Sequence, residues 1–186
     1  PPPGVLAGLL REGFGQMGRG GCGQGRGGLV GAEGLAATGA QPRELPARAS
    51  SLERRRWPLK VIGAGVPVYL LPIRSYWAEQ LFDETLARQS LFARDIQLGL
   101  AREHVYYRKP ANAGGISPGA RILWYVTGGR PPHAEGHVRA VSQVAEVIVG
   151  TPQALYRRFA RLGVYTEQQV IATAGSKGTV MALRFV

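Results

Sequence analysis

The chain has 186 residues, with 23 Lys and Arg against 12 Asp and Glu, which gives a formal net charge of +11 at pH 7. Its 45% hydrophobic residues are enough to bury the core of an ordinary domain. Such positive charge attracts polyanions, of which nucleic acid is the commonest. A membrane partner is not expected, because no apolar run approaches the roughly 18 residues of a spanning helix. GC-rich coding would also produce this arginine-dominated charge, so both explanations stay open.

The single cysteine, Cys22, excludes an intrachain disulfide and a cysteine-rich zinc site. The N-terminus has neither the basic start nor the long apolar stretch of a signal peptide. Both features predict a reducing, cytoplasmic location. Because the chain begins at Pro1 without methionine and ends on a strand-like run, we expect it to be a piece of a longer protein.

The first 59 residues are rich in Gly, Pro and Arg. Apolar residues at helical spacing predict a short helix over Val5–Phe14. Gly18–Gly28 is expected to be poorly ordered, because glycine loses much backbone freedom on folding. Pro42–Arg56 is polar, contains two prolines and is interpreted as a linker. We therefore predict an N-terminal segment and linker over 1–59 and a folded domain over 60–186.

Alternation and turn residues predict the elements of the first half of this domain. Val66–Ile73 is a β-rich run whose prolines, Pro67 and Pro72, favour an edge strand. Ser75 is expected to cap a helix with one apolar face, which carries Trp77, Ala78, Leu81 and Phe82. After a less certain region over 83–103, strands are predicted at 105–108 and 122–126, with a Ser-Pro-Gly turn between them at 117–119.

The second half is predicted as a long strand, two helices and a closing strand. His137–Val149 is either two strands or one bent strand. Thr151 and Pro152 start a helix whose buried stripe is Leu155, Phe159 and Leu162, and Gly163 ends it. Thr166 and Gln169 form a capping box for the next helix, which ends near Ala174. Val180–Phe185 is the last strand. The fold class is therefore α+β: a small mixed, barrel-like sheet with flanking helices.

Several of these stretches, in this order, resemble the PUA-like group of domains, and its ASCH and EVE types in particular. Leu71–Asp83 (LPIRSYWAEQLFD) is similar to the group's strand-to-helix opening, and Glu103–Arg108 (EHVYYR) to its Lys-x-x-Glu-x-Arg strand. Ser117–Val126, Ala145–Val147 and Gly163–Gln169 resemble later motifs. The likeness covers about residues 62–186. It implies a pseudobarrel that binds RNA or modified DNA.

Two positions depart from the ASCH pattern, because Glu103 and Tyr106 stand where the group has Lys and Glu. The resemblance implies that this Lys and Glu serve amide hydrolysis in some members. Their replacement favours a non-catalytic binding role, so no catalytic residue and no cofactor are expected. The segment between Phe82 and Glu103 is also longer than the pattern.

The chain also resembles proteins in which such a domain follows a GNAT-type acetyltransferase domain. Gln24–Gly28 (QGRGG) is similar to the loop that binds the pyrophosphate of acetyl-CoA, where backbone N–H groups hold phosphate. This gives an alternative function: the C-terminal part of an acetyltransferase with an accessory or regulatory domain. A fused or partner acetyltransferase domain would then be present, and a third hypothesis is an interaction domain that regulates it.

The resemblance places a nucleotide pocket between the strand–helix junction and the next strand, where a base stacks on an aromatic ring and cations hold phosphate. The implied nucleic-acid-binding residues are Arg74, Ser75, Tyr76, Trp77, Tyr106, Arg108 and Lys109. Two arginines on the exposed side of the later helix, Arg157 and Arg161, are candidates for phosphate contact.

Each of these residues also has a plain structural explanation. Trp77 shares its helix face with Leu81, so core packing competes with a role in the site. Tyr106 and Tyr107 alternate on a strand, so only one of them lines a pocket. Arg74, Lys109, Arg157 and Arg161 also fit a solvated surface, and Trp124 is expected in the core. His133, Glu135 and His137 lie close in sequence but lack a fourth ligand, so no metal site is predicted.

Overall fold

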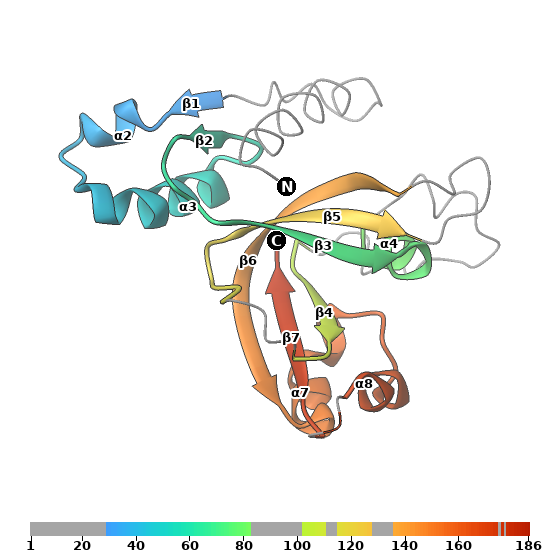
Figure 1. Ribbon diagram of the computed structural model, residues 1–186. Helices are drawn as coiled ribbons and strands as arrows, with labels where there is room; N and C mark the ends of the chain where they lie inside the picture. Colours follow the sequence, from blue (N-terminus) through green and yellow to red (C-terminus); the bar gives the residue numbers. More distant parts are fainter. Residues whose placement is uncertain (1–28, 83–101, 111–114, 128–135, 175, 177) are drawn as a thin grey trace. The chain divides into compact units, whose positions relative to one another are not determined.

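The computed structural model describes residues 29–82, 102–110, 115–127, 136–174, 176 and 178–186 (Figure 1). Two predicted segments, the helix over 5–14 and the glycine-rich stretch over 18–28, lie outside the described residues, as does most of the region over 83–103. The chain divides into two compact units, Pro1–Val66 and Pro67–Val186. The first unit therefore includes residues 60–66, which the sequence analysis assigned to the second domain.

The described part of the first unit is a two-stranded parallel sheet with helices between its strands. β1 (Leu29–Gly31) pairs with β2 (Lys60–Ile62), and the connection contains α2 (Glu33–Ala36), η1 (Pro42–Glu44) and α3 (Leu45–Arg55). The unit has its own small core, formed by Ala49, Val61, Ala64 and Val66.

The linker predicted over Pro42–Arg56 is wrong, because η1 and α3 occupy this segment. Its two prolines lie in the first turns of these helices, where a missing N–H costs no hydrogen bond. Further along α3, Ala49 and Glu53 are buried against the rest of the unit. The prolines that suggested a linker therefore mark helix starts.

The second unit is built on a five-stranded mixed sheet with the strand order β3-β5-β6-β7-β4. Its strands are β3 (Val68–Arg74), β4 (His104–Arg108), β5 (Arg121–Thr127), β6 (His137–Gly150) and β7 (Val180–Phe185). β3 and β5 are parallel, and the other pairs are antiparallel. The predicted strands and the α+β class are confirmed. β3 is an edge strand, as its prolines indicated.

The long strand β6 is one bent strand that joins two halves of the sheet. Its first half pairs with β5 and its second half with β7, with register shifts at Trp124/Tyr125 and Val144/Glu146. In Figure 1, β6 curves from β3 and β5 toward β7 and β4. The expected barrel does not close among the described strands, since β3 and β4 end the strand order without pairing to each other. The sheet is therefore strongly bent and open.

Two apolar clusters lie on opposite faces of β7. Met181, Leu183 and Phe185 face the larger cluster, which is shared with β3, α4 (Ser75–Leu81) and β5. Val180 and Ala182 face the smaller cluster, shared with β4, α7 (Pro152–Phe159) and α8 (Glu167–Thr173). Both clusters consist of residues from the second unit.

The helices of this unit begin largely where predicted. α7 starts at Pro152 after Thr151 and continues into η2 (Ala160–Leu162). α8 has the predicted capping box: Gln169 N–H donates to Thr166 Oγ1 at 3.3 Å, and Thr166 N–H donates to Gln169 Oε1 at 2.8 Å. The prediction for Ser75 is wrong, because Ser75 is the first residue of α4 and Arg74 occupies the capping position.

Candidate functional site

Two arginines from different strands act electrostatically on Tyr106. Arg74 ends β3, and Arg108 ends β4, which is at the opposite end of the strand order. Burial raises the pKa of Tyr106 above its usual value, while the positive charges of Arg108 and Arg74 act in the opposite direction. Both strand ends therefore lie within electrostatic range of the same hydroxyl.

Contacts between aromatic rings from four segments connect Tyr106 to the start of α4. Tyr76 contacts Trp77 edge to face at 4.7 Å between ring centroids, and Trp77 stacks on Tyr165 at 4.2 Å. Tyr165 contacts Tyr106 at 6.3 Å, and Tyr106 packs on Trp124 at 5.3 Å. Trp77 and Tyr106 each pack against both apolar clusters. We call Arg74, Tyr76, Trp77, Tyr106, Arg108 and Tyr165 the seam site, because they lie where the two halves of the sheet meet.

Tyr165 is the residue of the seam site that sequence reasoning missed. It lies just before α8, and its ring contacts both Tyr106 and Tyr107, which point to opposite faces of β4. It therefore lies beside the edge of β4 that pairs with no described strand. Its hydroxyl is buried without a partner of standard hydrogen-bond geometry. Burial raises its pKa well above the usual value, and the backbone of Tyr107 acts in the opposite direction.

The other aromatic residues of the prediction belong to the core. Trp124 is fully buried, and its indole N–H donates to Ser142 Oγ at 3.0 Å. Tyr107 is buried in the smaller cluster and donates to the backbone oxygen of Leu155 at 3.3 Å. Trp77 is half-buried and packs against both apolar clusters, so the core-packing explanation applies to it. Tyr76 keeps 48% of its surface exposed.

The remaining predicted residues lie on β4, α4, α7 and η2 or next to them. Lys109 is exposed just beyond β4, and Ser75 is half-buried in the first turn of α4. Arg157 and Arg161 are exposed on α7 and η2, with Arg157 Nε donating to the backbone oxygen of Gln153 at 3.4 Å.

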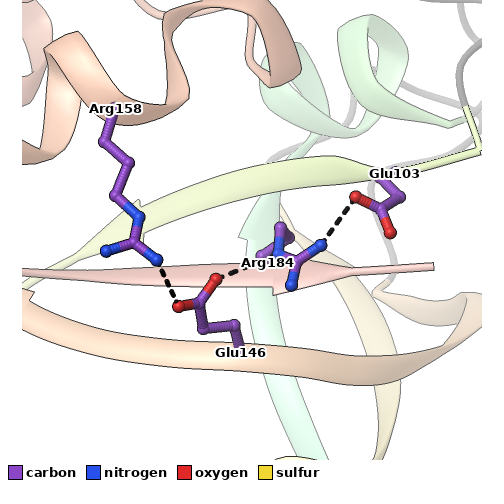
Figure 2. Close-up of polar contacts among 4 residues, drawn as sticks. All are labelled: Glu103, Glu146, Arg158 and Arg184. Atoms are coloured by element: carbon purple, nitrogen blue, oxygen red, sulfur yellow. Dashed lines mark hydrogen bonds and ion pairs between the residues drawn. The ribbon is translucent and has the colours of Figure 1, made fainter.

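The two acidic residues of the motif-like strands take part in a chain of four ion-paired residues (Figure 2). Arg184 on β7 contacts Glu103 at 2.7 Å and Glu146 at 3.1 Å, and Glu146 also contacts Arg158 at 2.6 Å. Hydrogen bonding to Glu103 is the main reason why the pKa of Arg184 is raised. Glu103, at the position where the ASCH pattern has Lys, thus contributes to packing between strands.

The residues considered for metal binding and for acetyl-CoA binding lie mostly outside the described part of the chain. His133, Glu135 and Gln24–Gly28 lie outside the described residues. Among the residues that are described, no group of three or more His, Cys, Asp or Glu is placed to hold a metal ion. No helix in those same ranges is long and apolar enough to cross a bilayer.

Comparison with known proteins gives one structural likeness. No family profile matches the sequence, and the comparison with curated proteins finds no match. Among solved structures, the chain is similar to the ASCH protein of Zymomonas mobilis, solved as a serine-to-alanine mutant. The TM-score is 0.44 at 17% sequence identity, and the match covers 63% of this chain and 66% of that chain. A likeness of this size does not define the family, so the function is argued from the residues of this chain.

Proposed function

We propose that the second unit binds single-stranded RNA at the seam site and without catalysis. The observation that carries the proposal is the series of ring contacts from the half-exposed Tyr76 through Trp77 and Tyr165 to Tyr106, on which the charges of Arg74 and Arg108 act. Guanidinium groups bind phosphate oxygens, and an exposed aromatic ring accepts a stacked base of any identity. The net charge of +11 favours the same class of partner.

In this proposal the residues have different tasks. Arg74 and Arg108 hold phosphates, Tyr76 stacks on a base, and Trp77 holds Tyr76 in place through their edge-to-face contact. The exposed pair Arg157 and Arg161 supplies additional phosphate contacts, which add affinity without selecting a base. A non-catalytic role is supported by Glu103 and Tyr106, since the first is ion-paired and the second is a phenol in place of a carboxylate.

The test is the affinity of the full chain for a labelled single-stranded RNA, measured by fluorescence anisotropy over a range of salt concentrations. Replacing both Arg74 and Arg108 by Ala is expected to weaken binding on the order of tenfold at low salt. The salt dependence of log K should become shallower by about 0.7 per arginine that contacts a phosphate. Tyr76→Ala should weaken binding with little change in this slope.

The variant with both Arg157→Ala and Arg161→Ala is the comparison at equal charge, because it removes two positive charges from the same unit at residues to which the proposal gives only additional contacts. A smaller loss than for the Arg74 and Arg108 variant is expected. Equal losses would mean that net charge alone drives binding and would contradict a site at the seam. Absence of RNA and DNA binding by the unmodified chain, even at low salt, would overturn the proposal.

A further inference from the structure

The first unit carries an exposed tryptophan directly after three consecutive arginines. Arg54 and Arg55 form the last turn of α3, Arg56 caps it, and Trp57 follows in the turn toward β2. All three arginines are exposed, and 57% of the Trp57 surface is open to solvent. Arginines in a last turn are favoured by the helix dipole. That explanation leaves the exposed indole unaccounted for.

The ring of Trp57 contacts the side chain of a buried lysine. Lys60 Nζ lies 4.1 Å from the ring centroid, a cation–π distance. Lys60 is only 6% exposed, and its ammonium group lies 3.4 Å from Oε2 of Glu53, which is 1% exposed. The other oxygen of Glu53 accepts the N–H of Val61 at 2.9 Å. The buried ion pair thus holds the ammonium group against one face of the indole, and the cation–π contact favours this position of the ring.

The neighbouring guanidinium groups are partly positioned as well. Arg55 donates to Ser51 one turn earlier, from Nε to the backbone oxygen at 3.5 Å and from Nη2 to Oγ at 3.2 Å. The patch thus combines three features. The Trp57 ring is exposed over much of its surface, the ammonium group of Lys60 lies over the ring, and the guanidinium groups of the neighbouring arginines are exposed. We call Arg54, Arg55, Arg56 and Trp57 the α3 patch.

We propose that the α3 patch is a second contact for single-stranded nucleic acid, in which a base stacks on Trp57 and the arginines hold its phosphates. The inference goes beyond the proposed function, because it concerns the other unit and residues that the seam site does not contain. Indole is a strong stacking surface for every base, and cations beside it make such binding tolerant of sequence and sensitive to salt.

An anionic membrane is the alternative partner, and the chain offers a way to separate the two. Leu29 on β1 and Ile62 on β2 are also exposed, at 55% and 54%. Insertion into lipid depends on the total apolar surface that is buried, so Leu29 and Ile62 would contribute to it. Stacking depends on a ring, so these aliphatic side chains would not matter. The supported ring of Trp57 favours stacking.

The experiment compares Trp57→Phe with Trp57→Leu in the full chain, using anisotropy of a labelled oligouridylate. Trp57→Leu should weaken binding on the order of tenfold, because it keeps apolar bulk but removes the ring, whereas Trp57→Phe should retain most of the affinity. Arg56→Ala should reduce the salt slope by about 0.7, and the exposed Arg43→Ala of the same unit should not. Circular dichroism and thermal melts confirm that each variant is folded.

A second series makes this proposal independent of the seam site. Trp57→Leu is repeated in the chain that already carries Arg74→Ala and Arg108→Ala, where a further loss of similar size is expected. Equal oligouridylate affinity for wild type and Trp57→Leu in both backgrounds would overturn the inference. It would also be overturned if vesicles containing phosphatidylserine bound the chain in a manner that depends on Trp57, Leu29 and Ile62 while oligouridylate did not.

Discussion

Tyr106 and Tyr107 are neighbours in the sequence, yet their side chains enter different surroundings, because successive residues of a strand point to opposite faces. Tyr107 is buried against α7, while Tyr106 reaches the seam site with Arg108, which follows it on the same face. Alternation alone predicted that only one of the two rings lines the site. It could not predict which face is which, because that depends on the later helices covering one side of β4.

Tyr107 gives a prediction for alkaline stability. Burial raises its pKa from 10.0 to about 12, so the folded chain keeps the phenol protonated where the unfolded chain does not. The free energy of unfolding that Tyr107 contributes is complete below pH 10 and is lost as the pH rises toward 12. Tyr107→Phe should therefore show a weaker loss of stability over this range than wild type, measured by urea unfolding. Parallel curves for the two proteins would contradict this.

Tyr165 was missed because the residues around it in the sequence do not indicate its contacts. Its sequence neighbours form the capping box of α8, and the local pattern explains Thr166 and Gln169 without indicating what Tyr165 contacts. Its partners, Trp77 and Tyr106, are more than fifty residues away in the sequence. The signal that could have pointed to it is an aromatic residue immediately outside a strong helix cap, a position where apolar side chains often fix the entry of the chain.

Individual elements were predicted best where local rules decide the outcome. The strand over 180–185 and the capping box of α8 agree with the structure, because alternation and capping depend on few residues. α3 was missed because its prolines were interpreted as breakers without asking whether they lie in a first turn. The pairing of Glu146 with both Arg158 and Arg184 was also beyond local reasoning, since it links α7, β6 and β7 (Figure 2).

The segment between η2 and α8 packs tightly on β4, which gives a prediction for Gly163. A Cβ at Gly163 would lie 2.7 Å from Val105 Cγ1, closer than two carbons can approach. Gly163→Ala should therefore destabilise the unit by about 1–3 kcal/mol, as overpacking commonly does. Denaturant unfolding followed by tryptophan fluorescence measures the change.

Gly34→Ala is the matched control for this substitution. Gly34 lies in α2, and its added methyl would meet nothing closer than 3.9 Å. Alanine is the better helix former, so this variant should be neutral or slightly stabilised. If Gly163→Ala were as stable as Gly34→Ala, the close packing of this segment on β4 would be contradicted.

For the molecule as a whole, the α+β class, the strand sequence and the edge position of β3 could be predicted from the sequence. The sequence could not predict that β3 and β4 stay unpaired with each other, because barrel closure depends on long-range strand pairing, which local patterns do not indicate. The seam site stays a prediction: the charges of Arg74 and Arg108 both act on Tyr106, and Arg157 and Arg161 are exposed on α7 and η2. The first unit was largely missed, since its strands have three residues each and its core is small.

The separation of the apolar clusters predicts that the second unit folds alone. Both of its clusters are made of residues after Val66, and the core of the first unit is made of residues up to Val66. A chain of residues 67–186 should therefore give a cooperative thermal transition and dispersed amide resonances. It should also keep RNA binding that is lost on replacing Arg74 and Arg108 by Ala. A truncated chain without a cooperative transition would contradict this.

The parallel pairing of β3 with β5 has a consequence for how the chain is synthesised. Val68 pairs with Arg121, so β3 leaves the ribosome well before its partner strand exists. During that interval its apolar residues have no neighbouring strand, and β4 emerges while β7, its own partner, is still to be translated. Nascent segments of this kind are open to misassociation, and long-range pairing forms slowly. Slower translation through residues 75–120 would therefore be expected to lower the yield of folded protein.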